Sequence, residues 1–274
     1  MEKKTRRGLL LGLAAAALPL YLAAPGRSSR RQRAPFMGRN FAHRGLHARD
    51  KSVPDISLEA FRQAARAGYG MELDVQLSRD GQVVVFHDDT LNRVCGVDAR
   101  VDELSYAELS QLHRSGTEYG IPLFSDVLAT VRGRGPLIVE LKNGRRNREL
   151  CEKTYALLEH YRGEVCIESF NPLIVAWFRL HARDLLRGQL AMPRDRYISE
   201  GRGGFQALLL SNTLLNFLAR PQFIAYQIGP RPLPVRIAEW MGAMKVGWTS
   251  HEPRNEKGRD AVIFEFYKPK LKYK

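Results

Sequence analysis

Short apolar runs of high β-propensity recur along most of the chain, and stretches with helical spacing lie between them. The runs that we interpret as strands are Asn40–Gly45, Gly70–Leu77, Val83–His87, Pro136–Lys142, Val165–Phe170, Phe223–Ile228 and Lys245–Ser250. Strands that alternate with helices form βα units with a parallel sheet. About eight strands over roughly 240 residues suit a (β/α)8 TIM-type barrel. The sequence does not indicate which segment closes that barrel.

The helical stretches have recognisable ends. Ser57–Ala67 has apolar residues at helical spacing and stops at Gly68, and Ser105–Leu112 begins with a serine followed three residues later by a glutamate. That serine–glutamate pair is a capping box, which favours a helix start. Arg148–Tyr161 and Pro172–His181 are also predicted helices. No GxGxxG motif follows the first strand, so a dinucleotide-binding fold has no support.

An uncharged apolar segment lies near the N-terminus, at Gly8–Ala24, with basic residues on both sides. As a helix it would span roughly 25 Å, the short limit for crossing a bilayer. A membrane anchor, a cleaved signal peptide and a buried helix compete, and the flanking charges argue against burial. We predict an uncleaved anchor, with a signal peptide as the alternative, on a membrane-associated and possibly exported protein. Residues 1–35 would then be anchor or signal segment plus linker, and residues 36–274 the barrel domain.

The positive charge gathers at the two ends of the chain. The net charge is +14, and half of it comes from residues 1–35, while four lysines lie among the last seven residues. This distribution argues against a nucleic-acid-binding face and fits tails that contact anionic lipid headgroups or simply aid solubility. A second apolar, uncharged stretch, Phe205–Leu218, is predicted as a core helix, with a membrane-contacting insertion as the alternative.

Acidic residues recur near the ends of predicted strands. Within the strand Gly70–Leu77, Glu72 and Asp74 share one face, and Asp88 and Glu140 lie at the ends of two others. The carboxyl ends of barrel strands converge on one mouth, where catalytic residues lie. Several carboxylates there would repel each other unless a cation neutralised them. Oxygen ligands without paired Cys or His suit Mg²⁺ or Ca²⁺.

Two histidines and two cations share these positions. His43 ends the first predicted strand and His87 the third, which suits an acid/base pair because imidazole titrates near neutrality. Arg44 follows His43, and Lys142 lies on the same strand face as Glu140. Such cations bind anionic groups, above all phosphate. The composition of the mouth therefore indicates metal-assisted phosphoester chemistry.

A series of short motifs appears in a fixed order. They are Phe41-Ala42-His43-Arg44-Gly45, Pro54 with Leu58 and Phe61, Glu72-Leu73-Asp74-Val75, Asp80-Gly81, Val84-Val85-Phe86-His87-Asp88, Glu140-Leu141-Lys142, Ser169-Phe170-Asn171 and Trp248-Thr249. The set resembles the glycerophosphodiester phosphodiesterase family, from about Asn40 to Thr249.

The resemblance implies a TIM-type barrel that cleaves glycerophosphodiesters to glycerol 3-phosphate and an alcohol. It also implies the site residues: His43 and His87 as general acid and base, Arg44 and Lys142 on the phosphate, Glu72, Asp74 and Glu140 on Mg²⁺ or Ca²⁺, and Trp248 at the substrate rim. In either route, direct attack by water or through a cyclic phosphate, one histidine takes a proton and the other gives one.

One motif departs from the family pattern. The family has Pro-Glu-Asn-Ser/Thr after the first strand, where this chain has Pro54-Asp55-Ile56-Ser57. The Glu of that motif is a metal ligand in the family, so Asp55 is predicted as a shorter, weaker ligand. Two alternatives stay open: a phospholipase D-type enzyme acting on lysophospholipids or sphingomyelin, and a catalytically impaired, membrane-tethered phosphate-binding barrel.

Overall fold

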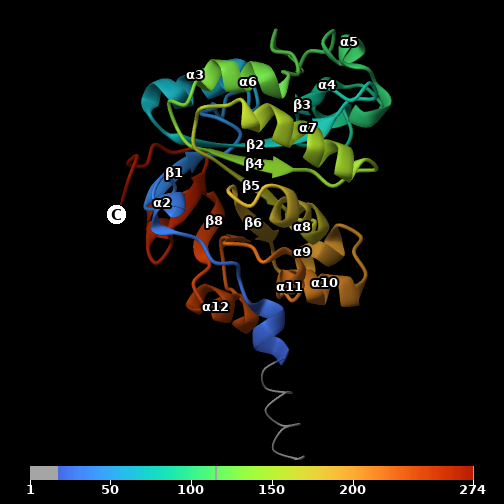
Figure 1. Ribbon diagram of the computed structural model, residues 1–274. Helices are drawn as coiled ribbons and strands as arrows, with labels where there is room; N and C mark the ends of the chain where they lie inside the picture. The colour runs from blue at the N-terminus through green and yellow to red at the C-terminus, as the bar shows by residue number, and fades with distance from the viewer. Residues whose placement is uncertain (1–17, 115, 274) are drawn as a thin grey trace, which may run out of the picture.

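Eight parallel strands form a closed barrel in the computed structural model, which describes residues 18–114 and 116–273 (Figure 1). The strands are β1 (Arg39–Ala42), β2 (Gly70–Leu77), β4 (Leu137–Leu141), β5 (Val165–Ser169), β6 (Leu186–Ala191), β7 (Phe223–Gln227), β8 (Met244–Ser250) and β9 (Ala261–Phe264). Each pairs with the next, and β1 pairs with both β2 and β9, which closes the ring. The predicted TIM-type barrel is confirmed.

Two barrel strands, β6 and β9, were absent from the prediction, and β9 is the strand that closes the barrel. In β6, Arg187 and Gln189 interrupt the apolar pattern although both are buried. The side chain of Gln189 donates to the carbonyl oxygens of Ser169 and Leu190, and that of Arg187 donates to the carbonyl of Ala219. Buried polar groups that find main-chain acceptors are tolerated in a core, but they hide the strand from a hydropathy pattern.

The third predicted strand is not part of the barrel. β3 (Val83–Val85) runs antiparallel to the end of β2. It belongs to an excursion before α6 (Phe124–Val131) that also contains α4 (Asn92–Cys95), the 3-10 helix η1 (Val101–Glu103) and α5 (Tyr106–Leu109). Val83 and Val85 pack into the main core and Val84 into a smaller core of the excursion, which explains why this strand is apolar on both faces.

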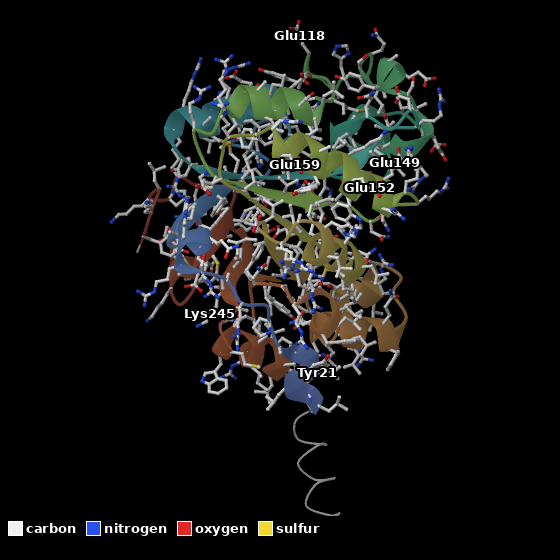
Figure 2. The ribbon with its side chains drawn as sticks, in the orientation of Figure 1. Tyr21, Glu118, Glu149, Glu152, Glu159 and Lys245 are labelled. Carbon is white, nitrogen blue, oxygen red and sulfur yellow. The ribbon has the colours of Figure 1, made fainter. Side chains whose placement is uncertain are left out.

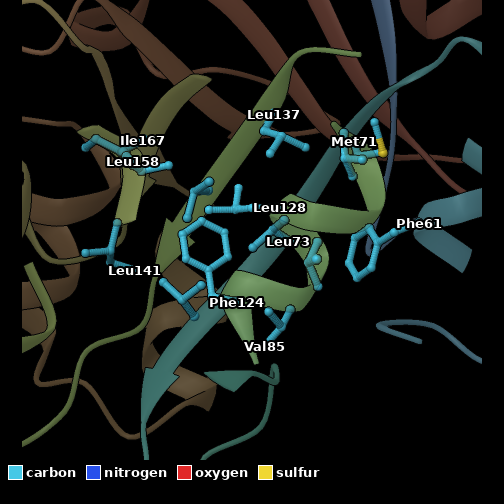
Figure 3. Close-up of a cluster of buried hydrophobic side chains, with 14 of the residues drawn as sticks. Phe61, Met71, Leu73, Val85, Phe124, Leu128, Leu137, Leu141, Leu158 and Ile167 are labelled. Carbon is cyan, nitrogen blue, oxygen red and sulfur yellow. The ribbon is translucent and has the colours of Figure 1, made fainter. Parts of the chain in front are cut away.

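Helices surround the barrel: α3 (Leu58–Ala67), α6, α7 (Asn147–Glu159), α8 (Pro172–His181), α9 (Arg194–Ser199), α10 (Gly204–Ser211), α11 (Asn216–Ala219) and α12 (Leu233–Trp240) (Figure 1). α3 begins after Ser57, whose hydroxyl caps it, and ends at Gly68 with φ 82°, as the sequence predicts. The largest core lies between β2, β4 and the helices α3 and α6, and Figure 3 shows Phe61, Leu73 and Phe124 within it.

A second apolar cluster fills the inside of the barrel below the mouth. Residues two positions apart on a strand share a face. Ile138 on β4 and Cys166 on β5 belong to this cluster, and each lies two positions before a glutamate of the mouth. This layer makes the barrel a packed core rather than a pore. Cys95, Cys151 and Cys166 are all free cysteines, the last two buried.

The prediction of a membrane anchor over Gly8–Ala24 is contradicted. Within residues 18–114 and 116–273, no helix is long and apolar enough to span a bilayer. Residues 8–17 of that segment lie outside the described residues. Its last residues pack on the barrel domain: the ring of Tyr21 contacts Phe217, and the carbonyl of the buried Ala23 accepts a hydrogen bond from Asn216 (Figure 2).

The stretch after this segment contains α2 (Arg30–Arg33), where the sequence suggested a solvated linker. Ser29 and Gln32 form a reciprocal capping box at its start. The apolar stretch Phe205–Leu218 divides into α10 and α11, because the chain turns at Thr213, which has φ 52°. Phe205 is 75% exposed while Ala207 on the same helix is buried, so α10 is a surface helix rather than a core helix.

Candidate active site at the barrel mouth

A cavity of about 820 Å³ opens at the carboxyl ends of the barrel strands. The predicted site residues His43, Arg44, Glu72, His87, Glu140, Lys142 and Trp248 all line it. Asp74 is fully buried beneath them on β2. Asp55 lines a neighbouring cavity that shares Arg44 with the first. The mouth is therefore the place where the sequence-predicted residues meet, as expected for a barrel of this type.

Three carboxylates form a compact cluster in this cavity. Glu72, Asp74 and Glu140 each offer an oxygen, and these oxygens lie within 4.8 Å of one another. Asp74 and Glu140 are register partners on β2 and β4. Neither oxygen of Asp74 has a hydrogen-bond partner among the residues that the structure describes, although the side chain is fully buried. Buried oxygens that lack donors are suitable ligands for a hard divalent cation, so this donor set fits Mg²⁺ or Ca²⁺.

Two basic side chains contact the cluster. The ammonium of Lys142 lies 2.9 Å from Glu140 Oε1 and 3.5 Å from Asp74 Oδ1. Arg44 lies 3.4 Å from Asp74 through Nε, and its main-chain N–H donates to Glu72 Oε2 at 3.1 Å. Burial would lower the pKa of Lys142, but the charges of Glu140 and Asp74 raise it above its usual range. Both basic side chains are therefore positively charged beside the carboxylates.

The turn after β1 sets the direction of Arg44. Arg44 has φ 53° and Gly45 has φ 83°, so two successive residues adopt the left-handed region. A Cβ on Gly45 would lie 2.9 Å from the carbonyl carbon of Ala60 on α3. Only glycine fits that approach, and a strained non-glycine residue beside it is typical of a functional site.

The pKa values of two carboxylates in the cluster are shifted in opposite directions. Burial raises the pKa of Glu72 well above its ordinary value, and the nearby charges of Asp74 and Glu140 add to this effect. Burial would also raise the pKa of Asp74, but His87, Lys142 and Arg44 lower it below its usual range. In the absence of a cation, Asp74 is thus the carboxylate that the surrounding positive charges keep ionised.

His43 has a carboxylate partner that the sequence did not reveal. Its Nδ1 lies 3.2 Å from Glu265 Oε2, and Glu265 follows β9 directly. An ionised carboxylate only accepts, so this contact places the proton on Nδ1 and leaves Nε2 free to accept. Burial lowers the pKa of His43, although the hydrogen bond to Glu265 acts in the opposite direction. Because β9 itself was not predicted, no local pattern could have found Glu265.

His87 is held by its neighbour in sequence. Its Nδ1 lies 2.6 Å from Asp88 Oδ1, and Arg93 donates to both oxygens of Asp88 at 2.6 and 2.9 Å. Burial would raise the pKa of Asp88, but the hydrogen bonds from His87 and Arg93 lower it below its usual range. The side chain of His87 is 35% exposed, against 14% for His43, so the two histidines have unlike surroundings.

Asp55 forms ion pairs with arginines. Its Oδ1 lies 2.6 Å from Arg114 Nη2 and its Oδ2 lies 3.6 Å from Arg44 Nη1. The next residue, Ile56, is buried and has φ 58°. Asp55 is outside the group of three carboxylates whose oxygens come together. The structure thus brings Asp55 to the edge of the site and turns its carboxylate toward Arg114.

A further glutamate, Glu168, was not among the predicted residues. It lies on β5 beside Glu140 of β4, and it lines the cavity although it is 1% exposed. Among the described residues its Oε2 has no hydrogen-bond partner, and like Asp55 it lies outside the group of three carboxylates. Burial raises the pKa of Glu168 well above its ordinary value, and the charges of Glu140 and Asp74 contribute. A glutamate at the alternating position of an otherwise apolar strand was the one signal in the sequence.

The opposite wall of the cavity is largely apolar, although Glu200, Arg202 and Gln206 also line the cavity. Trp248 on β8 donates from its indole N–H to the carbonyls of Ala191 and Ala225. Its ring lies edge-on to the ring of Phe170, with 5.8 Å between the ring centroids. Neighbouring apolar side chains on this wall are Leu173, Leu190, Met192 and Leu210. The indole is therefore locked in place by hydrogen bonds at its polar edge, and its ring forms part of the wall.

The model of the glycerophosphoryl diester phosphodiesterase family matches residues 43–258. The chain belongs to this family. A glycerophosphodiester phosphodiesterase of Bacillus altitudinis is 35% identical over 154 residues, which cover 52% of this chain and 62% of that protein. A lysophospholipase D of Rattus norvegicus is 30% identical over 158 residues, or 53% of this chain and 48% of that protein. The chain thus spans about half to two-thirds of these two relatives.

Solved structures of family members share the fold. A phosphodiesterase of Oleispira antarctica, in complex with the product sn-glycerol-3-phosphate, has a TM-score of 0.68 at 21% identity and covers 85% of this chain and 94% of its own. A protein of Silicibacter pomeroyi has a TM-score of 0.67 at 21% identity, with coverage of 88% and 91%. At 21% identity these likenesses show the fold, which is the same barrel over 85–88% of this chain.

Proposed function

We propose that this chain hydrolyses glycerophosphodiesters to glycerol 3-phosphate and an alcohol, with the help of a divalent cation. The observation that supports this most is the meeting of His43, His87, two partly buried basic side chains and a carboxylate cluster in one cavity. Acid/base groups, phosphate-binding cations and a metal site are the three components that metal-assisted phosphoester hydrolysis needs. Membership of the family supports this substrate class.

Glu72, Asp74 and Glu140 would hold the cation. When bound, it would neutralise charge on the non-bridging oxygens of the phosphate. Both Mg²⁺ and Ca²⁺ accept carboxylate oxygens, so the three carboxylates suit either ion.

Arg44 and Lys142 would bind the phosphate group. Their ion pairs with Asp74 and Glu140 hold both side chains at the floor of the cavity, with donors left for an anion above them. Arg44 in particular has five N–H donors, of which the carboxylates in contact take only part.

The two histidines would divide the proton transfers. His43 is only 14% exposed, its pKa is lowered, and its Nδ1 faces Glu265, so a neutral imidazole with Nε2 toward the cavity suits the base. His87 is more exposed, and its Nδ1 contacts the carboxylate of Asp88, which orients the ring for the acid that protonates the leaving oxygen. Trp248 and the apolar wall around it would face the alcohol portion of the substrate.

The test uses the full chain with glycerophosphocholine and either Mg²⁺ or Ca²⁺, and it measures release of glycerol 3-phosphate. We expect release that EDTA abolishes and that the same cation restores. The variant His43→Ala should remove the activity without unfolding the protein, as circular dichroism would verify.

Lysophosphatidylcholine provides a second arm. Release of choline from this lipid, with no product from glycerophosphocholine, would overturn the proposal in favour of a lysophospholipase D. If neither substrate gives a product with either metal ion, the chain would be a barrel that binds phosphate without hydrolysing esters.

A further inference from the structure

A second cavity, of about 300 Å³, lies beside the barrel mouth and shares Arg44 with it; we call it the side cavity. The loop after β1, the excursion between β3 and α6, and the segment after β9 line it. Its charged lining side chains, apart from histidine, are the basic Arg44, Arg49, Lys51, Arg93 and Arg114 and the acidic Asp55 and Glu265. The volume is at the small end of the range for ligand sites, and the excess of basic groups favours an anion.

The acids of the side cavity already have partners. Asp55 lies 2.6 Å from Arg114, and Glu265 lies 3.2, 3.6 and 3.7 Å from the nitrogens of three histidines. Arg93 pairs with Asp88, which lines the mouth and not the side cavity. The ion pairs of these residues therefore leave some of the basic lining groups without a carboxylate.

Arg49 and Lys51 are those groups. Among the residues that the structure describes, neither side chain forms an ion pair. The guanidinium of Arg49 lies over the ring of Phe266, 4.9 Å from the ring centroid, so an aromatic face positions it and its N–H donors stay available. Asp50 lies between the two in sequence, but its carboxylate accepts from Ser52 and does not line the cavity. Two unpaired positive charges match one dianion.

Arg114 adds a buried donor to the same cavity. Its side chain is 6% exposed, and its Nη2 donates to Asp55. Its Nη1 is buried and has no hydrogen-bond partner among the described residues. A buried donor without an acceptor costs free energy, so a bound oxygen anion that accepts from Arg114 would be favoured.

We propose that the side cavity binds a phosphomonoester-class dianion, either free phosphate or the glycerol 3-phosphate that the reaction would release. Such a group carries nearly two negative charges at neutral pH and offers three acceptor oxygens. Guanidinium groups bind these oxygens through several N–H donors at once. The site goes beyond the proposed function, in which the reacting phosphate binds in the mouth. Only the choice of glycerol 3-phosphate as a ligand rests on that function.

The experiment measures anion binding without substrate or metal. The full chain is freed of metal with a chelator and titrated in a calorimeter with inorganic phosphate and, separately, with glycerol 3-phosphate. The double variant Arg49→Gln/Lys51→Gln should weaken binding at the side cavity by at least about tenfold, because two charge-assisted contacts are lost. Arg148→Gln/Arg236→Gln is the matched control, since it removes the same charge from exposed positions on α7 and α12. The control should keep the wild-type affinity.

A variant of the mouth separates the two anion sites. Lys142 lines the mouth and does not line the side cavity. Lys142→Gln, with its fold verified by circular dichroism, should therefore keep the binding that Arg49→Gln/Lys51→Gln loses. The relative affinities of the two anions identify the source of the dianion. Phosphate that binds as tightly as glycerol 3-phosphate indicates a site that reads only the phosphate group, whereas tighter glycerol 3-phosphate indicates a site for the product.

Two results would overturn the inference. Equal weakening in the two double variants would reduce the effect to general attraction between anions and a basic protein. Wild-type affinity in Arg49→Gln/Lys51→Gln, together with loss of binding in Lys142→Gln, would confine anion binding to the mouth. Neither result bears on the hydrolysis of glycerophosphodiesters, because the titrations contain no substrate and no metal.

Discussion

The mouth of the barrel has two unlike halves. The strands β1, β2, β4 and β5 bring buried acids and partly buried arginine, lysine and histidine side chains to one side. On the other side, β6 and β8 bring Leu190 and Trp248, and α10 brings Leu210. Charges can be buried only in mutual contact, so the buried charges gather in one half, whereas Glu200 and Arg202, which also line the cavity, are exposed.

This contrast predicts how the two halves respond to substitution. Groups of the charged half should act on the reacting phosphate, so their loss should lower kcat. Groups of the apolar half should contact the substrate before and during the reaction to the same extent, so their loss should raise KM.

Replacing either histidine should have the largest effect. We expect His43→Gln and His87→Gln each to lower kcat by at least about 100-fold, the usual contribution of a positioned acid or base. Steady-state assays with glycerophosphocholine measure this effect. His160→Gln, at an exposed position after α7, is the control and should be neutral. Wild-type kcat in either variant would remove that histidine from the proposed reaction.

Removing the partner of His43 should have a smaller effect with a distinct pH signature. We expect Glu265→Gln to lower kcat by roughly 10- to 100-fold, as loss of a carboxylate behind a functional histidine usually does. Burial lowers the pKa of His43 and Glu265 raises it, so the variant should have a still lower pKa. A base that must be neutral then works at lower pH, and the acidic limb of the kcat/KM profile should move down. A profile that stays in place would rule out this coupling.

In the apolar half, Trp248→Ala should raise KM by up to about tenfold, equivalent to roughly 1.4 kcal/mol of lost contact, and leave kcat nearly unchanged. Trp248→Phe keeps a ring against Phe170 and should recover most of the affinity. A Trp248→Ala variant that loses kcat and keeps its KM would break the division between the two halves.

The smallest effect concerns stability at the rim of the charged half. Asp88 has a folded-state pKa below its usual value, so its ionised form stabilises the fold above the unfolded pKa of about 3.9. Asp88→Asn should therefore cost about 1–2 kcal/mol at neutral pH, and the cost should fade as the pH falls below that value. Urea unfolding at several pH values measures it. An equal loss at every pH would assign the effect to shape rather than charge.

Much of the fold and part of the site followed from local sequence patterns. Strand residues alternate between two faces, so the pattern of Gly70–Leu77 predicts that Glu72 and Asp74 point the same way, and both do lie in the mouth. The capping signals at Ser57 and Ser105 predict helix starts, and both helices begin there. These features depend on a few neighbouring residues, which is why the sequence by itself determined them.

Other features depend on contacts between segments that are distant in the sequence, so no local pattern predicts them. Glu265 meets His43 across 222 residues because β9 closes the barrel against β1. Asp55 accepts a hydrogen bond from Arg114, which is 59 residues away in the sequence, and it lies outside the carboxylate cluster. The end of the apolar N-terminal run lies against α11, whereas its hydropathy had suggested a membrane. Local patterns fix which way a side chain points along its own strand, but strand order and register fix what it meets.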